Sequence, residues 1–217
     1  MAIKPDTQLA EMLTLHREWA ASAGKAGKQL WLEDASLSNL DLSNTDLVEA
    51  VLPGANLNGA KLRQADLFGA NLASASLIQA DLGEASLNKS NCDAAILLKA
   101  NLRRARIIRA SFIEADLREA DLREADLTKS DFSGANLEGA IFSGAKLEKI
   151  TLTGARLFRV DLKGATSLDS ISAEWIDIGE KGKSVILTGD EIKEWLAGAK
   201  KSKRHLAPSA VLATDHG

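Results

Sequence analysis

The chain has 217 residues, of which 26% are charged and 4% are aromatic, and its formal net charge is −3. This charge is too small to indicate a nucleic-acid-binding protein, and the single cysteine, Cys92, excludes an internal disulfide and a cysteine-based zinc site. Neither a signal peptide nor an apolar run of membrane-spanning length is present, so a cytoplasmic protein is expected.

The first predicted element is a helix over residues 5–23. Pro5 stands near its start and Gly24 follows its end. Apolar side chains recur at helical spacing within it, at Leu9, Met12, Leu13 and Trp19. A repeat begins directly after this segment, and a stacked array of repeats needs a cover at each end. We therefore assign residues 1–30 to an N-terminal helical cap.

A five-residue repeat occupies residues 31–165. Every fifth residue from Leu32 to Leu162 is apolar, and nearly all of these central residues are leucine; the exceptions are Cys92, Ile107, Phe112, Phe132 and Phe142. The residue two places earlier is alanine from Ala50 to Ala145, except at Ser90 and Ser130. A period of five matches neither a helix nor a flat strand, so the chain must turn in every unit and point each leucine inward.

Glycine is frequent two places after the central residue, as at Gly54 and Gly59, where a type II turn requires a positive φ. Where a longer side chain stands there, as at Gln64, Glu84, Lys99, Arg104 and Glu124, we expect a different turn type. Repeated bends wind the chain into coils that stack about 4.8 Å apart, as neighbouring strands do.

Units such as residues 65–69, 115–119 and 135–139 resemble the A(D/N)LXX units of the pentapeptide-repeat family. The resemblance implies an all-β solenoid, a right-handed quadrilateral β-helix of about seven coils with four units in each. The segment around His16, Trp19, Gly24 and Gly27 resembles leaders that precede many bacterial arrays of this kind.

After the repeat, two short strands are predicted at residues 175–178 and 185–187, followed by a helix. Residues 188–191 have the spacing of a capping box at the start of that helix. Ile192, Trp195 and Leu196 would either cover the coil end or contact a partner, for example a second copy of the chain in a homodimer. We assign residues 166–198 to a C-terminal cap and residues 199–217 to a flexible tail.

No enzyme signature, cofactor-binding motif or metal-binding motif is found. Cys92 occupies an inward leucine place, and no motif puts a nucleophile beside His16, His205 or His216. The acidic residues fall at outward places of the repeat, and glycine-rich phosphate-binding motifs are absent from the sequence. We therefore predict a non-catalytic protein without a cofactor.

Positive charge forms the first candidate interaction surface. At a spacing of 20 residues, Lys89, Arg109, Lys129 and Lys149 form an unbroken column of cations, although stacked like charges destabilise one another. Either each cation pairs diagonally with an acid, or the column binds an anionic partner. A second column is interrupted and contains Arg63, Arg103, Arg123 and Lys163.

Apolar residues at outward places form the second candidate surface. Ile78, Ile96 and Leu98 converge on one face, with Phe158 farther along it. Another group, Val48, Phe68 and Ile108, lies on a different face. Such patches mark interfaces or lie beneath a terminal cap, and the sequence leaves both interpretations open.

The leading hypothesis is a protein-interaction or scaffold module, because a rigid rod with a filled interior presents only its outer faces. A third, minor hypothesis is an enzyme accessory function, in which the caps bring the rod to a catalyst. The alternative, implied by the family resemblance, is a DNA-mimicking regulator or protector of DNA gyrase. Members with that role are markedly acidic and rich in interior phenylalanine, whereas residues 31–165 carry 16 basic and 19 acidic side chains. Nucleic acid and membrane are not expected partners.

Overall fold

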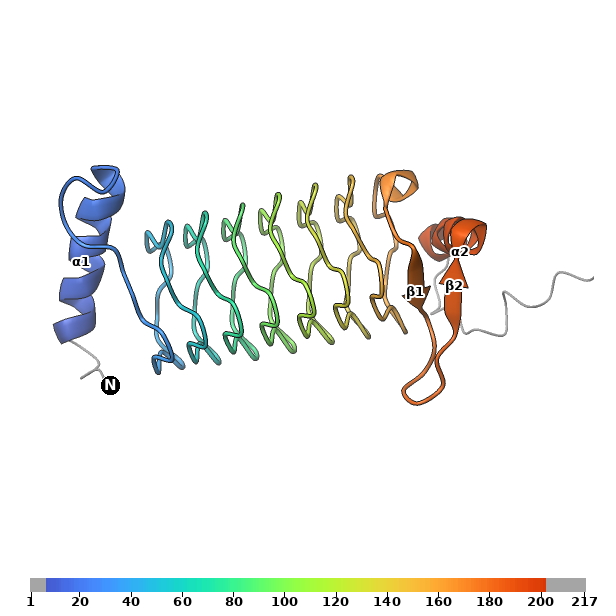
Figure 1. Cartoon of the computed structure of the whole chain (residues 1–217), viewed down its shortest axis with the longest axis horizontal. Helices are drawn as coiled ribbons and strands as arrows, with labels where there is room; N and C mark the ends of the chain where they lie inside the picture. The colour runs from blue at the N-terminus through green and yellow to red at the C-terminus, as the bar shows by residue number, and fades with distance from the viewer. Residues whose placement is uncertain (1–6, 202–217) are drawn as a thin grey trace, which may run out of the picture.

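The computed structural model describes residues 7–201 and shows an elongated rod with a helix at each end (Figure 1). Stacked coils form the body between α1 at one end and a short hairpin with α2 at the other. The elements in chain order are α1 (Thr7–Ala21), the 3₁₀ helix η1 (Leu168–Ser170), β1 (Trp175–Asp177), β2 (Ile186–Thr188) and α2 (Gly189–Lys201). None of the helices in this described part is long and apolar enough to cross a membrane.

The coils stack with a period of 20 residues. Single residues on successive coils form parallel β-bridges, from Trp31 with Val51 to Lys146 with Thr166. Four five-residue units therefore complete one coil, and residues 31–165 make nearly seven coils, as predicted. After η1 the register lengthens by one residue, so that Arg156 bridges to Asp177 and β1 continues the stack.

The central side chains fill the interior of the coils. From Leu32 to Leu162 none of them is more than 5% exposed, and the alanines from Ala50 to Ala145 are at most 2% exposed. Phe112 and Phe132 stack with their ring centroids 5.0 Å apart, one and two coils beyond Cys92. Burial raises the pKa of Cys92 to about 12, so this thiol is an inert part of the core, as predicted.

The two serines that replace inward alanines are also accommodated without unpaired hydroxyls. The Ser90 hydroxyl donates to the Leu87 carbonyl at 2.8 Å. The Ser130 hydroxyl donates to the Ile107 carbonyl, and its oxygen accepts the Ala110 N–H at 3.1 Å. Each buried polar group therefore has a backbone partner, which removes most of the cost of placing it among apolar side chains.

The structure explains why the residue before the central leucine is so often Asp or Asn. Its side-chain oxygen accepts the backbone N–H two residues later, for example Asp66 from Phe68 at 3.0 Å and Asn101 from Arg103 at 3.1 Å. This bond satisfies a turn N–H that the stacking leaves free. At Ile78 the acceptor is instead Asn58 of the preceding coil, at 2.9 Å.

The prediction of a second turn type was wrong. Every unit from Asp34 to Gly164 has a positive φ at the place two residues after the central residue, between 51° and 76°, whether glycine or a longer side chain stands there. Gln64 and Glu84 have φ values of 58° and 60°. The reason is that the N–H of this residue is held by the next coil, as in the 2.8 Å bond from Glu84 to the Arg103 carbonyl, so stacking overrides the local preference.

The N-terminal cap uses the residues that resemble a bacterial leader. The fully buried His16 stacks on Trp19, with ring centroids 5.7 Å apart. After α1 ends at Ala21, the Gly24 N–H donates to the Trp19 carbonyl at 2.8 Å with a φ of 81°. Leu9 packs into the core with 7% exposure, so α1 covers the apolar end of the first coil.

The C-terminal elements contain the two predicted short strands, which form a hairpin, and the predicted helix. The strands β1 and β2 pair antiparallel, and the Thr188 N–H donates to Glu191 Oε2 at 3.0 Å, as a capping box does. Ile192, Trp195 and Leu196 are only 4–5% exposed, so they cover the coil end and are not available for the predicted dimer contact.

The predicted boundary between cap and tail at residue 198 was wrong, because α2 continues to Lys201. Ala199 packs partly against the core, and alanine and lysine are strong helix formers. The rest of the predicted tail, residues 202–217, lies outside the described residues, as do His205 and His216.

Candidate interaction surfaces

The cation column, defined as Lys89, Arg109, Lys129 and Lys149, runs along one corner of the β-helix. Each member occupies the turn place with positive φ, between 56° and 63°, and each is exposed. The Lys89 N–H donates to the Ile108 carbonyl and the Arg109 N–H to the Thr128 carbonyl, both at 2.9 Å. The coil stacking therefore fixes the backbone of the column, with about 4.8 Å between successive members.

None of the four side chains forms a salt bridge with another residue of the described chain 7–201. The Lys89 ammonium instead lies 5.0 Å from the centroid of the Phe68 ring, a cation–π contact. The interpretation in which each cation pairs diagonally with an acid is therefore wrong for this column. Its positive charge is presented to solvent.

The interrupted column of cations has a different environment. Arg63 pairs with Glu84, Arg123 pairs with Asp121, and Arg103 lies 3.6 Å from Glu124. Glu124 also accepts a 2.8 Å bond from Arg104, and this bond holds the pKa of the Glu124 carboxyl below its usual value. Three of the four members of this column thus have an acidic partner, in contrast to the cation column.

The apolar patch of Ile78, Ile96 and Leu98 lies in the middle of the rod. Ile78 and Leu98 occupy the same turn place in successive coils, and Ile96 is 39% exposed. The terminal helices cover only the two ends of the rod (Figure 1), so neither cap lies over this patch. The interpretation in which a terminal cap covers the patch is therefore wrong, and the patch belongs to the outer surface of the rod.

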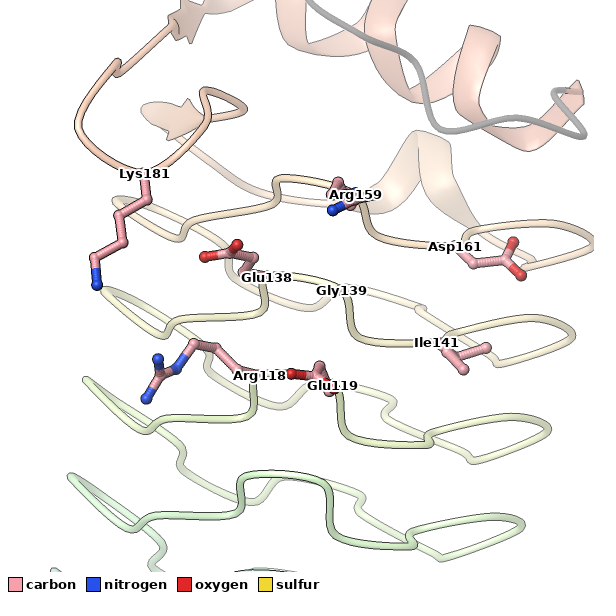
Figure 2. Close-up of a pocket in the computed structure, with 8 residues that line it drawn as sticks. All are labelled: Arg118, Glu119, Glu138, Gly139, Ile141, Arg159, Asp161 and Lys181. Carbon is pink, nitrogen blue, oxygen red and sulfur yellow. The ribbon is translucent and has the colours of Figure 1, made fainter.

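A charged hollow of about 530 Å³ continues along the corner that carries the apolar patch. Figure 2 shows its lining, in which Lys181 extends from the loop between β1 and β2 toward the side that carries Arg118. The hollow is lined by Arg118, Glu119, Glu138, Gly139, Ile141, Arg159, Asp161 and Lys181. Sequence reasoning missed it, because Lys181 joins the array only through the geometry of the hairpin.

The structure does not bring the two predicted surfaces together. Leu98 and Ile108 occupy equivalent turn places ten residues apart, which is half of a coil, so the apolar patch and the cation column lie on opposite corners. The second apolar group, by contrast, flanks the cation column, since Phe68 and Ile108 directly precede column places 69 and 109. That adjacency was readable from the sequence once the 20-residue period was known.

The described residues contain no group of three His, Cys, Asp or Glu side chains placed to hold a metal ion. His16 is buried in the N-terminal cap, and its Nδ1 accepts the Leu30 N–H at 3.0 Å, which gives it a structural role. The outer corners are thus the features that the geometry offers for recognition.

Stacked square coils with inward leucines, capped at both ends, define a right-handed quadrilateral β-helix. The family model for pentapeptide repeats matches eight copies, over residues 32–67, 65–106, 85–123 and 105–144. The chain therefore belongs to the pentapeptide-repeat family. No curated protein matches it significantly.

Two solved structures illustrate the likeness. A trypsin-treated variant of QnrB1, a plasmid-mediated fluoroquinolone resistance protein, is 23% identical, with 61% of this chain and 68% of that chain covered and a TM-score of 0.57. HetL, involved in heterocyst differentiation regulation in the cyanobacterium Nostoc sp., is 28% identical over 80% of this chain and 77% of its own, with a TM-score of 0.41. The likeness to the QnrB1 variant shows only that the two chains share a fold.

Proposed function

We propose that this pentapeptide-repeat protein is a non-catalytic interaction module, and that its cation column is the principal contact with a second protein. The observation that carries the proposal is the column itself, in which four exposed cations stand one coil apart without an acidic partner in the described chain. Stacked like charges cost stability. An acidic partner would compensate this cost on binding.

The filled interior supports a role that depends on the outer surface. Central side chains that are at most 5% exposed leave no enclosed space for a substrate. A rigid solenoid holds its surface side chains at fixed spacing, so little conformational entropy is lost in the scaffold when a partner binds. The apolar patch of Ile78, Ile96 and Leu98 is proposed as a second contact surface on the opposite corner.

Capture experiments with the full chain test this proposal. The tagged protein and an Arg109→Glu/Lys129→Glu variant would be cross-linked in extract of the native host, and the captured proteins compared. We expect one protein to be captured by the native chain and lost with the variant. Arg159→Glu is the matched control, because Arg159 is exposed at the same turn place on the opposite corner and forms no salt bridge among residues 7–201.

A parallel capture with Ile96→Asp and Leu98→Asp asks whether the apolar patch contacts the same partner or another one. Loss of a different protein would assign the patch a separate partner. A capture pattern that is identical for the native chain and for the column variant would overturn the proposal for the column.

The alternative of a DNA-mimicking regulator of DNA gyrase has no specific support in the surface. A mimic of DNA presents negative charge, whereas the column presents positive charge to solvent. A supercoiling assay with the added protein checks this directly. Protection or inhibition of gyrase would reverse the ranking of the two functions.

A further inference from the structure

We infer that the cation column binds an acidic amphipathic α-helix of the partner protein. This inference rests on the proposed function and specifies the chemistry of the partner. The binding surface would consist of the four cations together with Phe68 and Ile108, which stand one residue before the column at the same corner and are half-buried. It therefore has a row of charges with two apolar side chains beside it, which suits the polar and apolar faces of an amphipathic helix.

Among residues 7–201, no acidic group lies within salt-bridge distance of a column cation. Glu148 accepts from Lys146 at 3.1 Å. Asp131 accepts the N–H of Ser133 at 2.9 Å and its hydroxyl at 2.6 Å. Arg106, exposed on the adjacent side, forms no salt bridge with a residue of the described chain and adds to the positive charge.

The repeat distances of the β-helix and of an α-helix agree at this corner. Two coils rise about 9.6 Å, and seven residues of an α-helix rise about 10.5 Å. Acidic residues at helix positions i, i+3, i+7 and i+10 lie at about 0, 4.5, 10.5 and 15 Å, against about 0, 4.8, 9.6 and 14.4 Å for the four cations. The mismatch stays within about 1 Å, which a lysine or arginine side chain spans easily.

The two apolar side chains agree with the same helix. Phe68 lies one coil before Lys89 and Ile108 lies beside Arg109, at about −4.8 and 4.8 Å along the column. Apolar helix residues at i−3 and i+4, at about −4.5 and 6 Å, would therefore contact them on one side of the acidic row. An extended strand fits less well. Residues on one of its faces repeat about every 6.6–6.8 Å, so they do not stay in register with the coils. The phosphates of duplex DNA wind around its axis, so a straight line of cations meets few of them.

A designed peptide tests the inference with the full chain. The peptide carries Glu at i, i+3, i+7 and i+10 and Leu at i−3 and i+4 on an alanine-rich helix, and a scrambled peptide has the same composition. Fluorescence anisotropy at low ionic strength measures binding of each to the native protein. We expect the ordered peptide to bind at least about tenfold more tightly than the scrambled one, and to weaken as salt is added.

Variants locate the site of binding. Lys89→Glu/Lys129→Glu should weaken binding of the ordered peptide at least about tenfold, whereas Arg159→Glu should leave it within about twofold of the native value. Circular dichroism and thermal melting verify that each variant is folded. Equal binding of ordered and scrambled peptides, or equal effects of the two sets of variants, would overturn the inference.

Two further probes separate other anionic partners. Tighter binding of a 20-base-pair DNA duplex, or of vesicles containing phosphatidylserine, with loss in the column variant would show that the column recognises phosphate and would also overturn the inference. Failure of the peptide is distinguishable from failure of the proposed function. If column reversal still abolishes capture of a host protein, the function stands and only the helical partner is excluded.

Discussion

The Nδ1 atom of His16 accepts the backbone N–H of Leu30 at 3.0 Å, and this bond ties α1 to the chain that enters the first coil. A second tie lies close by, since the Lys28 N–H donates to the Leu15 carbonyl at 2.9 Å. Both bonds join the helix to the segment that leads into the repeat. The orientation of the N-terminal cap therefore depends on a neutral imidazole at His16, because a protonated ring offers no acceptor.

The stability of the cap is expected to depend on pH. Burial lowers the pKa of His16 below 6.5, against the opposing effects of the Asp46 carboxylate and the Val48 carbonyl. As the pH falls through about 6.5, the unfolded chain takes up a proton at His16 that the folded cap resists. The stability contributed by the neutral ring is thus complete above that pH and is lost below it.

Hydrogen exchange of the α1 amides measures this effect. Protection factors in α1 should fall between about pH 7 and pH 5 in the native protein, while those of the central coils change less. His16→Gln keeps a hydrogen-bond acceptor and does not titrate, so its α1 protection should vary less with pH. An identical pH profile in the native protein and in His16→Gln would contradict the assignment.

A substitution at Gly27 should detach the cap. Its φ is +71°, and a Cβ atom would lie 2.2 Å from the Leu15 carbonyl oxygen and 2.5 Å from the Trp19 nitrogen. Both neighbours are backbone atoms that cannot move without distorting α1. Gly27→Ala therefore combines a φ cost of about 1–2 kcal/mol with a steric clash, and we expect a total loss above about 2 kcal/mol in urea unfolding.

Gly182 supplies the matched control for this prediction. It has a φ of +81°, and nothing lies within 4 Å of the position that a Cβ would take. Gly182→Ala should therefore show the φ cost alone. If the two alanine substitutions destabilise the protein equally, the close packing of Gly27 on α1 has no energetic importance.

The five-residue period in the sequence predicted the central leucines. The coil of 20 residues was implied by the family resemblance, and the column of cations followed from that coil. The sequence did not predict the positive φ at Glu84, since the penalty for a single residue is outweighed only when all coils stack. The sequence also did not predict that the cations of the column form no salt bridge within residues 7–201. Acids stand at several offsets, and Arg118 binds Asp116 in its own coil at 2.6 Å, whereas the spacing favours Glu138.

The strain at the non-glycine turn places predicts that some glycine substitutions stabilise the protein. Ala94 is exposed at such a place, with a φ of 55°. Ala94→Gly removes a left-handed penalty of about 1–2 kcal/mol and adds about 0.4–1 kcal/mol of unfolded-state entropy cost, so a net gain of about 0.5 kcal/mol is expected. Thermal melting measures the gain as a small rise in Tm.

Ala73 is the control for this substitution. It stands one residue before the positive-φ place of its own unit, and its own φ is not positive. Its N–H and carbonyl bonds to Asn71 and Gly54 are made by the backbone and are retained by glycine. Ala73→Gly should lower the stability by about 0.5–1 kcal/mol. Opposite signs for Ala94→Gly and Ala73→Gly are the decisive result, and equal signs would refute the role of φ.

The last prediction concerns Ile96, which occupies the place where Asp or Asn normally accepts a turn N–H. The Leu98 N–H has no hydrogen-bond partner within the described chain, in contrast to the Arg103 N–H, which Asn101 accepts. Ile96→Asn would supply that acceptor and also reduce the apolar patch. The new bond is expected to offset most of the lost apolar contact, since a hydrogen bond of this kind contributes about 1 kcal/mol.

Val51→Asn separates the bond from the loss of the side chain. Val51 has the same place in its unit, but residue 53 is proline and has no N–H to donate. Urea unfolding should therefore find Ile96→Asn more stable than Val51→Asn by about 1 kcal/mol, each measured relative to the native protein. Equal losses would mean that the side-chain oxygen does not stabilise the turn, and that the frequent Asp and Asn of the repeat have another cause.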